Sequence, residues 1–172
     1  QAIVNKIVDL ALVEGDGTNG FKSIEKEADA KKIKKITTKA KSAGKTPFAD
    51  AIEEAVDFVR PTAGRRYLIV KAEDRRALLD ELRQATANAN VRIKNDDAEI
   101  ASEVGVDEII VYTGTKAVKP TVLVDQKYHI DMQDLTKVDA FEWKTNSNMI
   151  LVETLTSGHV ETYNAGAVIT VA

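Results

Sequence analysis

Apolar residues near the start of the chain recur three and four positions apart, a spacing that predicts an amphipathic helix over residues 2–13. Two overlapping stripes, which start at Ile3 and Val4, make the apolar face of this helix unusually wide. Such a face implies burial on more than one side, or a partner that covers part of it. Gly15 is expected to close the helix in a left-handed conformation.

A second helix is predicted over residues 47–59. Thr46 is expected to cap its N-terminus, and Pro47 fits the first turn because an N–H would have no partner there. Apolar residues from Phe48 to Val59 form a single stripe that faces a core. The segment at residues 60–64, which contains a proline and a glycine, is expected to end the helix.

Beyond residue 65, short apolar runs alternate with turn-forming residues, a pattern that predicts β-strands. Two further helices are predicted between the first and second of these strands. These helices are expected over residues 73–85 and 98–104, the second of them capped by Asp96 or Asp97. The strands are expected at Tyr67–Val70, Glu108–Tyr112, Thr121–Asp125, Phe141–Lys144, Met149–Leu155, Val160–Tyr163 and Val168–Val171, with turns at Asn146-Ser147-Asn148 and Ser157-Gly158. Helices followed by a late run of strands favour an α+β fold over an alternating α/β fold.

Charge is distributed unevenly along the chain, whose formal net charge is -3. Residues 31–45 hold seven lysines and no acidic residue: Lys31, Lys32, Lys34, Lys35, Lys39, Lys41 and Lys45. This lysine block is interpreted either as a mobile basic loop or as a short strand flanked by lysines. As a site of contact it fits nucleic acid or an acidic surface on a neighbouring subunit, although it lacks the interleaved arginines and aromatic residues of a dedicated nucleic-acid reader.

The composition excludes several kinds of chemistry. The chain has no cysteine, so disulfide bonds, thiolate zinc sites and cysteine nucleophiles are excluded, which fits synthesis in a reducing compartment. Its two histidines, His129 and His159, are not spaced as metal ligands. No apolar run approaches the ~20 residues of a membrane span, and the N-terminus does not resemble a signal peptide. We therefore expect no metal, no cofactor and no membrane partner.

Three arrangements that could suggest catalysis or ligand binding have simpler explanations. Gly15-Asp16-Gly17 follows a helix instead of preceding one, so it lacks the aimed N–H groups that hold phosphate, and the residues after it do not match a calcium loop. Asp96-Asp97-Glu99 is interpreted as the start of a helix. A triad of Ser157, His159 and Asp125 lacks the strand–turn–helix that presents a nucleophile. The chain is therefore predicted to be no enzyme and to take no small-molecule substrate.

Three stretches of the chain, in this order, resemble tailed-bacteriophage major capsid proteins, which have the Hong Kong 97-like shell-protein fold. The first is Ile7–Gly17 with Gly20–Ile24, where a helix runs into a Gly-Asp-Gly turn. The second is Tyr67–Val70 with the helix at Arg75–Leu82. The third comprises Phe141-Glu142-Trp143, Asn148–Glu153, Gly158 and Ala165–Ile169. The resemblance rests on the order of all three, because no single motif is specific.

The resemblance implies a capsid-shell fold with a peripheral α+β domain, a spine helix, an axial domain, and mixed or antiparallel sheets. It assigns residues 1–60 to the end of the spine helix, the Gly-Asp-Gly turn, the basic loop and the second helix. Residues 61–120 would form an axial-type domain, and residues 121–172 the closing strands of the peripheral domain. The lysine block departs from the pattern of the family.

The function that the resemblance implies is structural. The protein would self-assemble into the pentamers and hexamers of an icosahedral shell, with other copies of itself as partners and at most non-specific contact with packaged DNA. It would lie in the virion, after a stage in the host bacterial cytoplasm. The alternative is a small intracellular nucleic-acid-binding or regulatory module that uses Lys31–Lys45.

The chain starts with Gln1 inside an apolar pattern, which indicates a fragment cut inside or just before a helix. By the resemblance, the N-terminal arm and extended loop of the family would then be missing. A fragment without these segments is expected to be monomeric or weakly associated.

Overall fold

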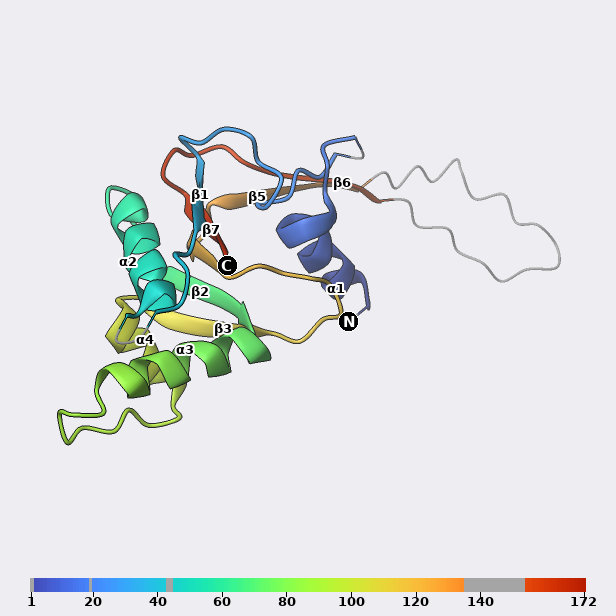
Figure 1. The fold of residues 1–172 in the computed structure, drawn as a ribbon. Helices are drawn as coiled ribbons and strands as arrows, with labels where there is room; N and C mark the ends of the chain where they lie inside the picture. Colours follow the sequence, from blue (N-terminus) through green and yellow to red (C-terminus); the bar gives the residue numbers. More distant parts are fainter. Residues whose placement is uncertain (1, 19, 43–44, 135–153) are drawn as a thin grey trace, which may run out of the picture.

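The computed structural model describes residues 2–18, 20–42, 45–134 and 154–172 (Figure 1). The helical elements are α1 (Ala2–Asp9), the π-helical segment η1 (Leu10–Glu14), α2 (Pro47–Val59), α3 (Ala72–Ala85) and α4 (Asp97–Val104). The strands are β1 (Ile33–Thr37), β2 (Arg66–Lys71), β3 (Glu108–Tyr112), β4 (Thr121–Val124), β5 (Tyr128–Asp134), β6 (Thr154–Val160) and β7 (Gly166–Thr170).

Five strands form a mixed sheet in the order β1-β7-β4-β2-β3. The outer pairs, β1 with β7 and β2 with β3, are parallel, and β4 runs antiparallel to both of its neighbours. Strands from the first, middle and last thirds of the chain therefore lie in one sheet. The prediction of an α+β fold with a mixed sheet is confirmed at this level.

One face of the main sheet is covered by α2, α3 and α4. Its core is almost entirely aliphatic and takes buried side chains from all three helices and from all five strands. Representative members are Ile52, Leu78, Ile100, Leu68, Val122, Ile36 and Ile169. Burial of these side chains is the main source of stability for this half of the molecule.

The opposite face of the sheet is covered by η1, by the segment around Ile24 and by the base of a two-stranded ribbon, β5–β6. Leu12, Ile24 and Val160 pack there against sheet residues such as Val168. Figure 1 shows the ribbon extending away from the main sheet and α1 standing on a different side from α2 and α3. The sheet is therefore covered on one face and over part of the other, and parallel pairs are normally covered on both faces.

The prediction that Gly15 closes the first helix in a left-handed conformation is wrong, because its φ is -62°. The helix instead widens into η1, and the Gly15 N–H donates to the Leu10 carbonyl at 3.0 Å. A Cβ at Gly15 would lie 2.7 Å from the carbonyl oxygens of both Leu10 and Phe21. Glycine is needed here for a close approach of two backbone segments, and not for its positive φ.

The prediction that Thr46 caps α2 through its side chain is also wrong. The Glu81 carboxylate, from the middle of α3, accepts hydrogen bonds from the backbone N–H groups of Phe48 at 3.2 Å and Ala49 at 2.9 Å. Glu81 is 6% exposed, so its buried charge is satisfied by the start of another helix. Pro47 does occupy the first turn, as predicted.

The start of α4 agrees with the prediction, since the Asp96 side chain accepts a hydrogen bond from the N–H of Ala98 at 3.3 Å. The turn predicted at Ser157-Gly158 is wrong, because both residues lie within β6 and pair with β5. Gly158 fits there because a Cβ would lie within 2.9 Å of the rings of Tyr128 and Phe21.

The end of the chain departs from the prediction in two further ways. The strand predicted over Val160–Tyr163 is wrong, since β6 ends at Val160 and a turn follows. Strand β5 was not predicted. The strand predicted at Phe141–Lys144, most of Met149–Leu155 and the turn at Asn146-Ser147-Asn148 lie outside the described residues.

Candidate functional site

The lysine block begins as strand β1, and the alternation of a strand sends its side chains to opposite faces of the sheet. Lys34 lies on the α2 side, where its Nζ is 2.7 Å from Glu54 Oε1. Lys35 points to the other side and donates hydrogen bonds to the carbonyl oxygens of Ile24, at 2.9 Å, and Glu25. Loss of hydration lowers the pKa of Lys35, an effect that nearby carboxylates partly offset.

The remaining lysines of the block are dispersed. Lys31 Nζ lies 6.0 Å from the centre of the Tyr163 ring, and Lys32 is half-buried where β1 begins. Lys39, Lys41 and Lys45 are exposed in the segment between β1 and α2. The structure therefore does not gather the seven predicted contact residues on one surface, and their role in contact remains a prediction.

A hollow of about 450 Å³ lies between the end of β1 and the start of α2. Lys39 and Lys45 line it, but so do the carboxylates of Asp50 and Glu54. The acidic side chains of α2 thus offset the basic charge at this point, and a phosphate backbone would meet both signs of charge.

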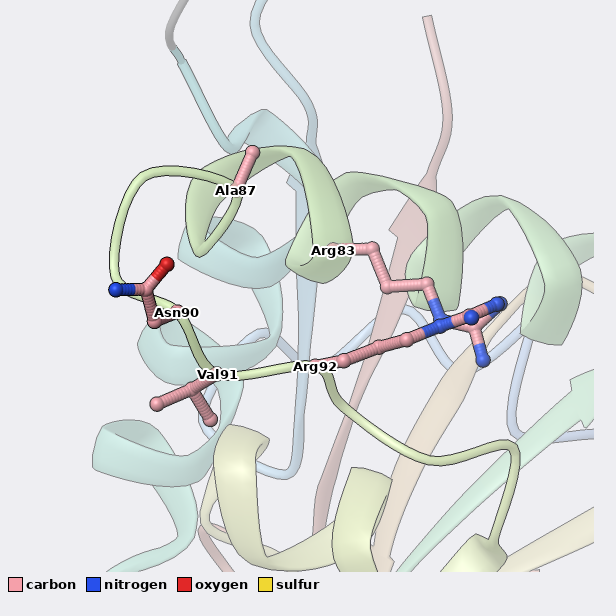
Figure 2. Close-up of a pocket in the computed structure, with 5 residues that line it drawn as sticks. All are labelled: Arg83, Ala87, Asn90, Val91 and Arg92. Atoms are coloured by element: carbon pink, nitrogen blue, oxygen red, sulfur yellow. The ribbon is translucent and has the colours of Figure 1, made fainter.

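A second hollow, of about 330 Å³, lies beside the loop that follows α3 (Figure 2). Arg83 and Arg92 point toward the same side of it, and Val91 is 61% exposed at its rim. The Nε of Arg83 donates to the carbonyl oxygen of Ile93 at 2.9 Å, which fixes the loop to α3. The sequence does not predict this arrangement, because nothing in the spacing of the two arginines brings them together.

The two histidines, His129 and His159, are distant in sequence but pair directly across β5 and β6. Their rings are 6.3 Å apart, and His159 Nε2 lies 2.7 Å from Glu161 Oε1. This hydrogen bond, aided by the neighbouring imidazoles, lowers the pKa of Glu161. Within the part of the chain that the structure describes, no group of three or more histidine and carboxylate side chains is arranged to hold a metal ion.

The structure does not bring the residues of the Ser157, His159 and Asp125 triad together. Ser157 and His159 lie in the ribbon, whereas Asp125 follows β4 in the main sheet, and the His159 ring bonds to Glu161 instead. Asp97 pairs with Arg75 at 2.5 Å, which ties α4 to α3. Among the described residues, no helix is long and apolar enough to cross a membrane.

Comparison with known proteins supplies the context for these surfaces. No protein-family model matches the chain. The chain is 95% identical over all 172 residues to the capsid protein of Lactococcus phage p2, and equally to that of Lactococcus phage SK1. It spans 44% of the length of these curated relatives. From its first residue to its last, the chain is thus similar to part of a bacteriophage capsid protein, as the order of its motifs predicts.

Proposed function

We propose that this chain is a structural part of the subunit that builds an icosahedral bacteriophage capsid. The observation that carries the proposal is the 95% identity to two phage capsid proteins over the full length of the chain. A difference of one residue in twenty is compatible with the same fold and the same contacts, since most surface substitutions change stability little.

In the proposed shell, copies of the full-length protein meet through different surfaces around five-fold and six-fold axes, so each contact within such a ring is heterologous. Residues 1–60 would supply the end of the spine helix and the basic segment, residues 61–120 an axial-type domain and residues 121–172 the closing strands of the peripheral domain. The two core clusters, one on each face of the main sheet, suit this role, because close packing resists deformation of a shell subunit.

The proposed subunit has no catalytic role, which the relatives support because both are named as capsid proteins. Other copies of itself would be its partners, in the host cytoplasm before assembly and in the virion afterwards. Contact with packaged DNA would be non-specific, through exposed lysines such as Lys39, Lys41 and Lys45.

The proposal is tested by expressing the full-length protein and examining it by sizing chromatography and negative-stain electron microscopy. Closed particles of uniform diameter are expected. Small soluble species at every protein concentration would contradict the proposal.

A matched variant tests whether the exposed lysines of the lysine block bind DNA. Replacing Lys39, Lys41 and Lys45 with glutamine removes exposed charge and spares the structural contacts of Lys34 and Lys35. Particles should still form, and binding to DNA at ~50 mM salt should be weak with or without the substitutions. Tight binding that is lost in the variant would instead favour a nucleic-acid-binding module.

A further inference from the structure

An apolar groove of about 670 Å³ runs between the first helical segment and the face of the main sheet that lies opposite α2–α4. One wall comes from α1 and η1 and the other from β2, β3 and β4. The main apolar lining residues are Val8, Leu12, Ile69, Ile110, Tyr112 and Leu123. The groove is therefore a place where the cover of the sheet is incomplete.

Two large aliphatic side chains in this groove are left in contact with solvent. Val8 on α1 is 39% exposed, and Ile110 on β3 is 42% exposed. On the other face of β3, Ile109 is only 5% exposed. Strand β3 thus leaves Ile110 exposed on the groove side, although Tyr112 on the same face is 8% exposed and a strand in a parallel pair is normally covered on both sides.

Two of the polar side chains that line the groove, Tyr112 and Asp9, are partners of one another. The hydroxyl of Tyr112 donates to the Asp9 carboxylate at 2.5 Å and accepts from the backbone N–H of Lys116 at 3.2 Å. Glu14 pairs with Lys116 at 2.7 Å. The rest of the lining is mainly apolar, so an occupant would gain free energy chiefly by burying aliphatic side chains.

We propose that an apolar segment of the same polypeptide, from outside these 172 residues, fills this groove. The inference rests on the proposed function, in which the chain is part of a capsid protein as long as its relatives. More than half of the length of those relatives lies beyond the match, since the chain spans 44% of it. That length supplies ample chain to cover Val8 and Ile110, and an intramolecular segment binds at high effective concentration.

Cysteine labelling of the full-length protein tests the proposal. The 172 residues contain no cysteine, so Ile110→Cys introduces a single thiol here, and the unsubstituted protein gives the background from the rest of the chain. The labelling rate with a small maleimide is measured in the native, unassembled protein and in the urea-unfolded protein. Val91→Cys is the matched control, because Val91 is 61% exposed and lies away from the groove.

A filled groove should slow labelling of Ile110→Cys by about 100-fold or more relative to the unfolded protein, because the thiol then reacts only after local opening. Val91→Cys should react at close to the unfolded rate. Val8→Cys, on the opposite wall of the groove, should be protected together with Ile110→Cys.

Two outcomes overturn the proposal. The groove stays open if Ile110→Cys is labelled less than about 100-fold more slowly than in the unfolded protein, both before and after assembly. Protection that develops only in assembled particles would mean that a second copy fills it. Failure of the proposed function is a separate result, since it would appear as an absence of particles whatever the labelling rate.

Discussion

At the scale of single residues, several side chains owe their roles to contacts with distant parts of the chain. Gly15 is fixed by the backbone of Phe21, and Lys35 by two carbonyl groups of the segment that precedes β1. The residue types alone suggest a helix-closing glycine and a solvated lysine. In the structure, Gly15 instead allows two backbone segments to approach closely, and the ammonium group of Lys35 is partly desolvated.

Gly15→Ala should destabilise the fold, because the added Cβ would lie 2.7 Å from two carbonyl oxygens that belong to fixed backbone. We expect a loss of about 3 kcal/mol in the free energy of unfolding, measured by urea denaturation. Gly17→Ala is the control: Gly17 has φ +91° but nothing within 4 Å of its added Cβ. It should cost only about 1–2 kcal/mol of backbone strain, and equal losses in the two variants would contradict the steric explanation.

Lys35→Gln should lower the free energy of unfolding by about 1 kcal/mol, because it weakens hydrogen bonds to the carbonyl groups of Ile24 and Glu25. Lys41→Gln, at an exposed position of the same lysine block, should change it by less than about 0.5 kcal/mol. Thermal or urea denaturation of both variants measures the difference. A larger loss for Lys41→Gln would show that the block acts through its net charge.

At the scale of elements, polar side chains join helices and loops that are distant in sequence. Glu81 connects α3 to the start of α2, and Glu14 connects η1 to the segment between β3 and β4 through Lys116. Both links depend on which segments the sheet brings together. Neither follows from the residues that flank the glutamates.

Glu81→Gln should destabilise α2, because the neutral amide accepts hydrogen bonds from the N–H groups of Phe48 and Ala49 less strongly and loses the favourable interaction with the helix dipole. A loss of about 1–3 kcal/mol is expected. Asp80→Asn, at the exposed neighbouring position on α3, removes the same charge and should have an effect near zero. The prediction fails if urea denaturation gives the two variants the same midpoint.

The contribution of Glu14 to stability should depend on pH. Hydrogen bonds and ion pairs with Lys116 and Lys6 lower its pKa from 4.5 to about 2 in the folded protein. A lowered folded pKa means that the stabilisation is present above pH 4.5 and is lost as the pH falls toward 2. Wild type should therefore exceed Glu14→Gln in denaturation midpoint at pH 7, and the difference should shrink by pH 3. A difference that is constant with pH would exclude this link.

At the scale of the whole molecule, one sheet carries a core on each face, and strands from all parts of the chain form it. The covering is complete on the side of α2–α4 and incomplete at the groove beside α1. The chain also spans less than half of its relatives. A folded body with an unfilled apolar groove is compatible with a part of a larger subunit.

The 172-residue chain by itself should be monomeric or weakly associated, whereas the full-length protein should form particles. The reason is that the chain spans only 44% of the length of its relatives, and the proposed assembly would draw contacts from the rest. Sizing chromatography with light scattering over a range of concentrations measures this directly. A stable pentamer or hexamer of the 172 residues would be inconsistent with the prediction.

The sequence by itself determined the helices α2 and α4, the strands β2 and β3, the α+β class and the resemblance to phage capsid proteins. These features depend on local periodicity, on caps such as Asp96, and on the order of motifs along the chain. Only the tertiary structure decided the cap from Glu81, the place of Gly158 inside β6, the pairing of the histidines and the dispersal of the lysine block. Each of these depends on strand order and register, which bring together residues far apart in the chain and which local pattern does not encode.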